Sequence, residues 1–237
     1  MTEAELNARL ELAAVYRLIH HYGWDDLWFT HISAKIPGTS SFLINEFGLF
    51  FNEITAGNLV KVDIAGNVIA GGEINPAGFV IHSAIHAAKP NVGCIIHTHT
   101  VAGVAVSIDQ RGLLPISQQV VDILPSLAYH DFHGVFTDAN EKRELVNNLS
   151  NNTCMILRNH GLLTVGRSAS ESFLRMYQLE KACSIQTMSD LDHAILIDKK
   201  VLSEKRGFKL DPAWSWKHLQ RLVEKNYPDY KDGANTV

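Results

Sequence analysis

The segment Cys94-Ile95-Ile96-His97-Thr98-His99-Thr100 carries more information about fold and function than any other part of this chain. Its apolar first half is typical of a buried strand, and side chains alternate between the two faces of a strand. His97 and His99 therefore project from the same face, where both imidazoles can bind one cation. Neutral imidazole is a standard ligand for zinc and other first-row divalent metals. Cys94 lies on the opposite face, which predicts a core residue.

A third imidazole is available at His160, within Arg158-Asn159-His160-Gly161-Leu162. There the polar His-Gly pair separates two apolar runs, residues 154–157 and 162–165, as a turn between two strands does. The sequence therefore predicts one metal site made of His97, His99 and His160. For the pair His97 and His99 taken alone, two satisfied or surface histidines remain the alternative.

Composition excludes several classes of protein. The chain has 237 residues, of which 46% are hydrophobic and 19% charged, and this suits a single globular domain over residues 1–237. Its core is expected at about 5–190, followed by a helical tail at about 191–237. A net charge of -4 without a dense Lys/Arg block argues against nucleic acid or a membrane surface as partner. An acidic N-terminus, no long apolar run and three unpaired cysteines predict a cytoplasmic protein.

Apolar periodicity and turn residues predict mixed helices and strands. Helices are expected at 3–21, 77–88, 101–108, 138–149 with Asp138 as N-cap, 168–188 and 212–223. Strands are expected at 28–36, 42–44, 59–62, 67–69 and 93–98, and as a hairpin at 154–165. A less regular stretch is expected to lead through Pro115 and Pro125 to residues 128–133. Hairpin strands mixed with helices indicate an α/β fold around a largely antiparallel central sheet.

Four landmarks, with their order and spacing, carry a resemblance to a known family: residues 23–33, residues 75–82, His97-Thr98-His99-Thr100 and Asn159-His160-Gly161-Leu162. Over roughly residues 5–190 the chain resembles the class II aldolase/adducin family. The resemblance implies a three-layer α/β/α fold and a metal held by His97, His99 and His160. Zn²⁺ is the first expectation, with Mn²⁺, Fe²⁺ or Co²⁺ as alternatives. It also implies a cyclic homotetramer with active sites at subunit interfaces.

The chain departs from the sugar-phosphate aldolases of that family at several places. Gly78 occupies the position of their catalytic glutamate, and the nearby Glu73 is expected to be a solvated turn residue. Thr30-His31 and Phe47-Gly48 replace the small donors of their phosphate pocket. Gln118-Gln119 falls near their active-site tyrosine. These differences speak against a sugar-phosphate aldolase.

Other stretches resemble the adducin-like branch of the family, namely residues 77–88 and 128–134 and the tail at 216–222 and 227–230. Eukaryotic adducins use this domain in actin–spectrin scaffolding, and the resemblance therefore implies a second possibility besides an enzyme. That possibility is a non-catalytic binding module with a vestigial metal site.

No catalytic residue is assigned from the sequence, but some polar residues are candidates. Three histidines are the best acid–base candidates because imidazole titrates near neutrality: His31, His130 and His133. His82 and His86 lie four residues apart on one helical face. Together they could bind a second metal ion. We expect instead that one of them lines the site and the other packs against the sheet. Arg158 could either bind an anionic substrate or form an ordinary ion pair.

A cation held by three neutral imidazoles keeps its charge and an open position, and can polarise a carbonyl group. The sequence therefore favours a metal-dependent lyase acting on a small hydroxy- or keto-acid, by aldol cleavage or decarboxylation. An aromatic tail, with Trp214, Trp216, Tyr227 and Tyr230, is unusual on a free surface and favours a homo-oligomer.

Overall fold

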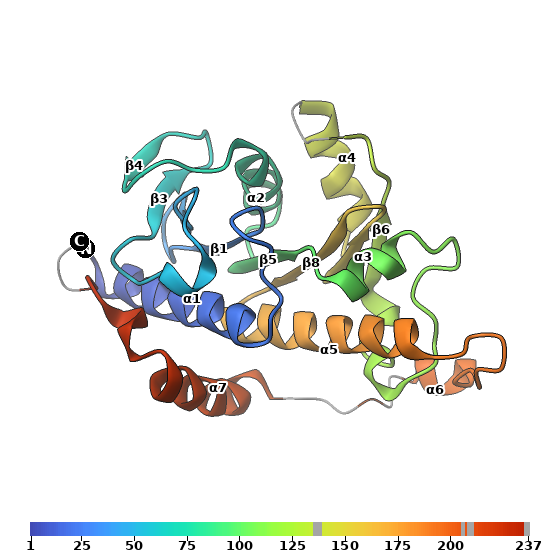
Figure 1. The fold of residues 1–237 in the computed structure, drawn as a ribbon. Helices are drawn as coiled ribbons and strands as arrows, with labels where there is room; N and C mark the ends of the chain where they lie inside the picture. The colour runs from blue at the N-terminus through green and yellow to red at the C-terminus, as the bar shows by residue number, and fades with distance from the viewer. Residues whose placement is uncertain (135–138, 205–206, 208–210, 235–237) are drawn as a thin grey trace.

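The chain forms one eight-stranded sheet in the order β4-β3-β2-β1-β5-β8-β7-β6 (Figure 1). A computed structural model describes residues 1–134, 139–204, 207 and 211–234. The strands are β1 (His31–Lys35), β2 (Ser41–Ile44), β3 (Val60–Asp63), β4 (Val68–Ala70), β5 (Cys94–Thr98), β6 (Leu127–His130), β7 (Cys154–Leu157) and β8 (Gly161–Gly166). All neighbouring strands described are antiparallel except β6 and β7, so the expected largely antiparallel sheet is confirmed.

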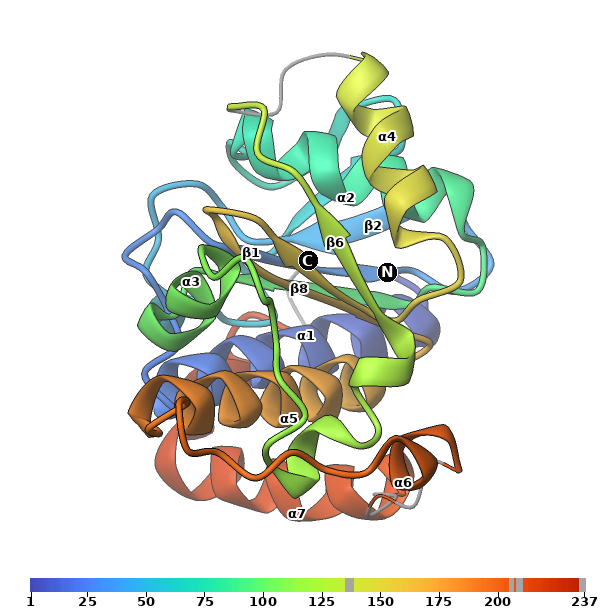
Figure 2. The same cartoon turned by 90° about the vertical axis from the view of Figure 1, so that its right-hand side faces the viewer.

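Helices cover both faces of the sheet (Figure 2). On one face lie α1 (Glu3–His21), α3 (Val101–Ser107) and α5 (Ala169–Met188), and on the other α2 (Pro76–Ala88) and α4 (Ala139–Leu149). Two hydrophobic clusters fill the spaces between these layers, and a smaller third one lies between β2, β3 and α2. The expected three-layer α/β/α arrangement is therefore confirmed.

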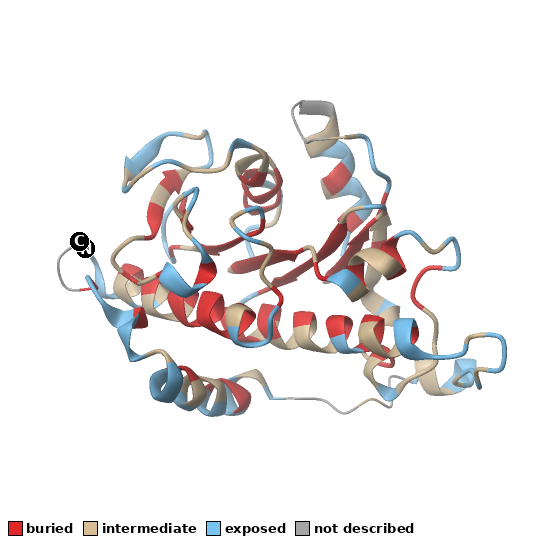
Figure 3. Cartoon of the chain, viewed as in Figure 1, coloured by how far each residue is buried: buried red, intermediate tan, exposed pale blue. Residues whose placement is uncertain are grey.

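The central strand β5 shows why the layers form. β5 and β8 are buried along their whole length (Figure 3). Cys94 and Ile96 belong to the cluster under α1 and α5, while Ile95 belongs to the cluster under α2 and α4. This alternation places His97 on the α2 side of the sheet, and it confirms that Cys94 is a core residue.

Some elements differ from those expected. β6 was not predicted, and neither was the short helix α6 (Lys199–Ser203). The first strand begins at His31 rather than Trp28, because residues 27–29 form a turn in which Leu27 has a positive φ of 49°. Asp138, the expected N-cap of α4, lies outside the described residues. None of the helices that the structure describes is both long and apolar enough to cross a membrane.

The tail packs against its own chain, with α7 (Pro212–Asn226) and the 3-10 helix η4 (Pro228–Lys231) lying beneath α1 and α5 (Figure 1). Trp216 and Tyr230 are buried there, and the Arg17 guanidinium donates to the carboxylate of Asp229 at 2.8 Å. Trp214 is exposed, at 61%. The aromatic tail is therefore largely covered within one subunit, and by itself it does not indicate an oligomer.

Candidate metal centre

Three histidines converge at one end of the sheet. His97 lies near the end of β5, His99 directly follows it, and His160 lies in the turn between β7 and β8. Their candidate ligand atoms all lie within 4.8 Å of one another. The structure thus brings together the three residues that the sequence singled out as metal ligands.

Local backbone features present His160 to the other two imidazoles. Asn159 has φ of 57°, a left-handed conformation that asparagine tolerates better than most residues. A Cβ at Gly161 would lie 2.4 Å from the carbonyl oxygen of Thr98, so only glycine lets the turn approach β5 this closely. The His-Gly pair that interrupts the apolar pattern is therefore a structural requirement of the site.

Neighbouring acceptors fix the hydrogens on two of the rings. His97 Nδ1 donates to the carbonyl oxygen of Leu162 at 2.9 Å, and His99 Nδ1 donates to the carboxylate of Asp26 at 3.1 Å. In a neutral imidazole this leaves a lone pair on each Nε2, and these two nitrogens lie 2.9 Å apart. Two facing lone pairs at this distance repel each other unless a cation, a metal ion or a proton, lies between them. The donor set therefore fits a divalent metal.

Burial keeps two of the three candidate ligands, His97 and His160, in the neutral form that binds metals. It lowers the pKa of His97 well below its ordinary value, and the neighbouring His99 and His160 lower it further. Burial likewise lowers the pKa of His160, to about 4. Orientation of a ligating imidazole by a carboxylate or a carbonyl is the usual arrangement in metal sites, and Asp26 and Leu162 supply both kinds here. Asp26 was not predicted, since nothing in the sequence distinguishes it from its neighbour Asp25.

A cavity of about 330 Å³ opens beside the three histidines. Its lining combines a few polar groups with apolar and aromatic side chains: Asp26, Phe29, His31, Asn75, Ala77, Ile81, His97, His99, Phe132, Gly134 and His160. This combination is typical of a small-molecule site. The cavity could enclose a substrate of a few carbon atoms against the histidine cluster.

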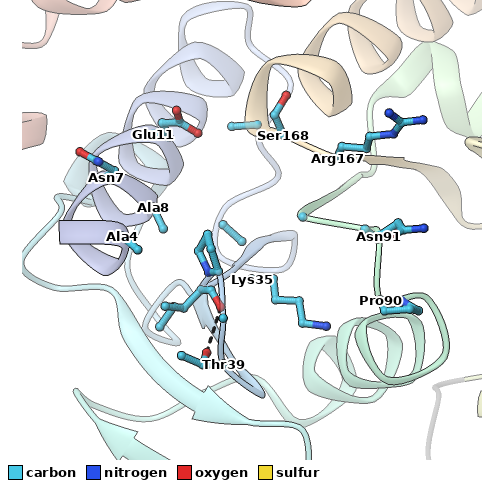
Figure 4. A pocket seen from close by; sticks show the side chains of 17 residues that line it. Ala4, Asn7, Ala8, Glu11, Lys35, Thr39, Pro90, Asn91, Arg167 and Ser168 are labelled. Carbon is cyan, nitrogen blue, oxygen red and sulfur yellow. Dashed lines mark hydrogen bonds between the residues drawn. The ribbon is translucent and has the colours of Figure 1, made fainter. Parts of the chain in front are cut away.

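A larger cavity of about 650 Å³ lies elsewhere (Figure 4). It is lined by residues such as Glu11 of α1, Lys35 at the end of β1 and Arg167 after β8. These positions are at the opposite end of β1 and β8 from the histidines. Among the described residues it holds no group of converging metal ligands. Chemistry rather than size therefore identifies the smaller cavity as the candidate site.

The structure separates the acid–base candidates. His31 lines the cavity, whereas His130 and His133 do not. His130 forms a hydrogen bond of 2.9 Å with Asn148, and His133 is exposed beside Glu144. Of these three histidines only His31 lines the cavity of about 330 Å³, while His130 and His133 line a smaller neighbouring pocket that also includes His160.

Other sequence candidates lie away from the cavity. Neither His82 nor His86 lines it, so the expectation that one of them does was wrong; both are buried, His82 beside His31 and His86 beside Ser33. Glu73 is exposed, as expected of a solvated turn residue. Arg158 stacks on the ring of Tyr129 and donates to the carbonyl oxygen of Asp109, an ordinary structural role.

Comparison with known proteins agrees with this geometry. The family model described as Class II Aldolase and Adducin N-terminal domain matches residues 10–187. A Pseudomonas aeruginosa protein, named provisionally as an aldolase class 2 protein, is 45% identical over 98% of this chain and 94% of its own length. Rat alpha-adducin is 43% identical over 80% of this chain, which corresponds to 27% of that longer protein. The crystal structure of an aldolase II superfamily protein from Pseudomonas syringae matches with a TM-score of 0.93 and 42% identity, covering 98% of each chain.

Proposed function

The chain belongs to the class II aldolase/adducin family, and on that premise we propose that it is a divalent-metal-dependent lyase. Its substrate in this proposal is a small hydroxy- or keto-acid, and the reaction is an aldol cleavage or a decarboxylation. The observation that carries the proposal is that the Nε2 atoms of His97 and His99 lie 2.9 Å apart beside a small cavity.

His97, His99 and His160 would hold the metal, for which Zn²⁺ is the first choice because imidazole suits it well. When bound, a cation of this kind acts as a Lewis acid that polarises a substrate carbonyl or carboxylate oxygen. Asp26 keeps the His99 ring oriented. The half-exposed rings of Phe29 and Phe132 border the cavity and would restrict the access of water to a bound substrate.

Two features argue against a sugar phosphate as substrate. Gly78 provides no carboxylate in the position where the aldolases that the chain resembles have their general base. No lysine or arginine is found among the described residues lining the cavity, so a phosphate dianion would lack a cationic side chain there. We expect negligible turnover of fuculose 1-phosphate or ribulose 5-phosphate, because loss of a positioned base costs about 10²–10⁴-fold in rate. Robust turnover of either compound would contradict this expectation.

Metal analysis tests the site directly. The protein purified from cells should contain about one transition metal ion per chain, and the double variant His97→Ala, His99→Ala should contain almost none. A variant with His133→Ala provides a control that removes an exposed imidazole close to, but not lining, the cavity. Undiminished metal in the double variant would refute the site. Screening the metal-loaded protein against small hydroxy- and keto-acids then tests the reaction.

A non-catalytic binding module is the alternative, and the similarity to alpha-adducin favours it. In that case the metal site is vestigial or structural. The two functions differ in a measurable way, because a structural metal raises the melting temperature without conferring turnover on any acid in the screen.

We also propose a cytoplasmic homo-oligomer, a tetramer in the first instance. Exposed apolar side chains that line the cavity support the oligomer, since Phe29 is exposed by 48% and Phe132 by 54%. Apolar groups gathered beside a binding site are typical of a surface covered by a partner. A second subunit in this position would narrow the entrance to the cavity.

A further inference from the structure

The cavity of about 650 Å³ at the other end of the sheet has no role in the proposed function (Figure 4). Its volume lies within the range of small-molecule sites. It is bordered by the first half of α1, the start of α5, the turn after β1 and the residues just before β5. Gly93 in its lining and the metal-ligand candidate His97 are four residues apart along one strand, which corresponds to about 13 Å. A ligand in this cavity would therefore lie apart from the candidate metal centre.

Two cations lie in one row across the strands at this cavity. The antiparallel register of β1, β5 and β8, carried one residue further, places Lys35 opposite Gly93 and Gly93 opposite Arg167. Two backbone hydrogen bonds of 2.8 Å support this row: the Lys35 N–H donates to the carbonyl oxygen of Gly93, and the Gly93 N–H donates to that of Gly166. Since neighbouring strands are about 4.8 Å apart, the backbones of the two cations are about 10 Å apart.

Gly93 leaves the space between the two cations open. It lines the cavity without a side chain, and a Cβ at this position would lie 2.2 Å from the carbonyl oxygen of Arg167. The close approach of the two chain segments therefore requires glycine here. Figure 4 shows the side chains of Lys35 and Arg167 extending toward the side where Pro90 and Asn91 lie. Both side chains are long and flexible enough to reach one ligand held over Gly93.

Neither cation is neutralised by a carboxylate of the described residues. The ammonium group of Lys35 has one long contact, at 3.5 Å from the carbonyl oxygen of His86. The guanidinium group of Arg167 is exposed and has no hydrogen bond or ion pair within the part of the chain that the structure describes. Glu11 is the one acid among the described lining residues, and Figure 4 places it on α1, across the cavity from both cations. Two positive charges thus face the cavity without a paired counter-charge.

Other cations near this end of the sheet are already engaged. Arg175 forms an ion pair of 3.4 Å with Glu171 and donates to the carbonyl oxygen of Val165. Lys89 donates to the carbonyl oxygen of Ser150. Arg175 and Lys89 line a neighbouring cavity and not this one. The two cations of the larger cavity are therefore the ones left available to a ligand.

We propose that this cavity binds a small dicarboxylate, with one carboxylate held by Arg167 and the other by Lys35. A guanidinium group binds a carboxylate through two parallel hydrogen bonds, and an ammonium group binds it as a point charge. Two cations whose backbones are about 10 Å apart suit two separated negative groups better than a single compact anion. Neither residue lines the cavity beside the histidines, so binding here is independent of the proposed function.

Titration calorimetry with succinate and its mono-amide, succinamate, tests the proposal on the purified protein. The two probes have nearly the same shape, but succinamate carries one negative charge fewer. Succinate should bind roughly fivefold more tightly, which is the usual effect of one partly exposed charge-assisted contact. This preference should weaken as salt is added, because salt screens exposed ion pairs.

Matched substitutions separate this cavity from its surroundings. Arg167→Gln and Lys35→Gln should each weaken succinate binding roughly fivefold and remove most of the preference over succinamate. Arg175→Gln and Lys89→Gln remove cations that do not line the cavity, and each should change succinate binding by less than about twofold. Glu11→Gln should strengthen succinate binding, because it removes the one negative charge from the described part of the lining.

The metal centre is the competing site, because a dicarboxylate can also chelate a metal ion. The double variant His97→Ala, His99→Ala and the chelator-treated wild type both lack that metal, and each should bind succinate as the untreated wild type does. Loss of binding in these two samples would place succinate on the metal and overturn the proposal.

Three other results would also overturn it: no succinate binding by the wild type, equal affinities for the two probes, or the same weakening in the control variants as in Arg167→Gln. Each of them leaves the metal content unchanged and therefore does not affect the proposed function. Conversely, a protein without bound metal that still prefers succinate would refute the metal site alone. Should Lys35→Gln fail to fold, Arg167→Gln decides the question, since it changes an exposed side chain.

Discussion

Replacing Gly78 with alanine should destabilise this protein, although alanine is ordinarily the better helix residue. Gly78 is the third residue of α2, where alanine by itself would contribute up to about 1 kcal/mol. The new Cβ would, however, lie 2.5 Å from His31 Cδ2, while ordinary contact begins at 3.4 Å, a shortfall of 0.9 Å. His31 cannot easily retreat, because His82 holds its Nδ1 at 2.7 Å and His97 lies beside it.

The size of the effect follows from these two opposing contributions. Overpacking of a tightly filled site costs about 1–3 kcal/mol. After subtraction of the gain in helix propensity, a net loss of about 1 kcal/mol in the free energy of unfolding remains. For a chain of this length such a loss lowers the melting temperature by about 2–4 °C.

Thermal unfolding of four proteins measures the effect: the wild type, Gly78→Ala, His31→Ala and the double variant. In the His31→Ala background the clash is absent, so Gly78→Ala should now raise the melting temperature instead of lowering it. This reversal of sign is the signature of direct competition between the two side chains. The reasoning would be refuted if Gly78→Ala stabilised both backgrounds to the same extent.

Three further predictions concern the metal, pH and assembly. Asp26→Asn should weaken zinc binding about 10–100-fold in a calorimetric titration, because it removes the carboxylate that orients the His99 ring. Asp25→Asn is the control: it removes a carboxylate that pairs with His20 and should leave zinc binding unchanged. The free energy of unfolding should fall as the pH is lowered from about 6.5 towards 3. The pKa of His86 in the folded protein is lowered to about 3, so between these pH values the unfolded chain binds a proton at this ring and the folded chain does not. The slope is about 1.4 kcal/mol per pH unit for each such histidine, and His86→Leu should unfold with a flatter pH dependence. Light scattering should give a multiple of the 26.3 kDa chain mass, and a stable monomer at micromolar concentration would contradict the oligomer.

Simple periodicity predicted the α/β class, the largely antiparallel sheet and the shared face of His97 and His99, whereas the three-layer arrangement was implied by the family resemblance. Alternation along β5 was enough to place His97 on the opposite face from Cys94, and the break in the apolar pattern at His160 marked a turn. The strand β6 was missed because it has only four residues and pairs in parallel with β7 across an intervening helix. Such a pairing depends on the packing of α4 against the sheet, which local sequence does not encode.

The wall of the cavity could not be predicted for a related reason. His31 meets His97 through the antiparallel register of β1 and β5, and meets Gly78 through the packing of α2 on β1. Each residue taken alone is misleading. Gly78 suggests only that a catalytic base is absent, and His31 is one of three acid–base candidates. Only the fold shows that the two positions compete for one volume. At position 78 an imidazole from another strand, held by three buried polar groups, occupies the space that a side chain would need.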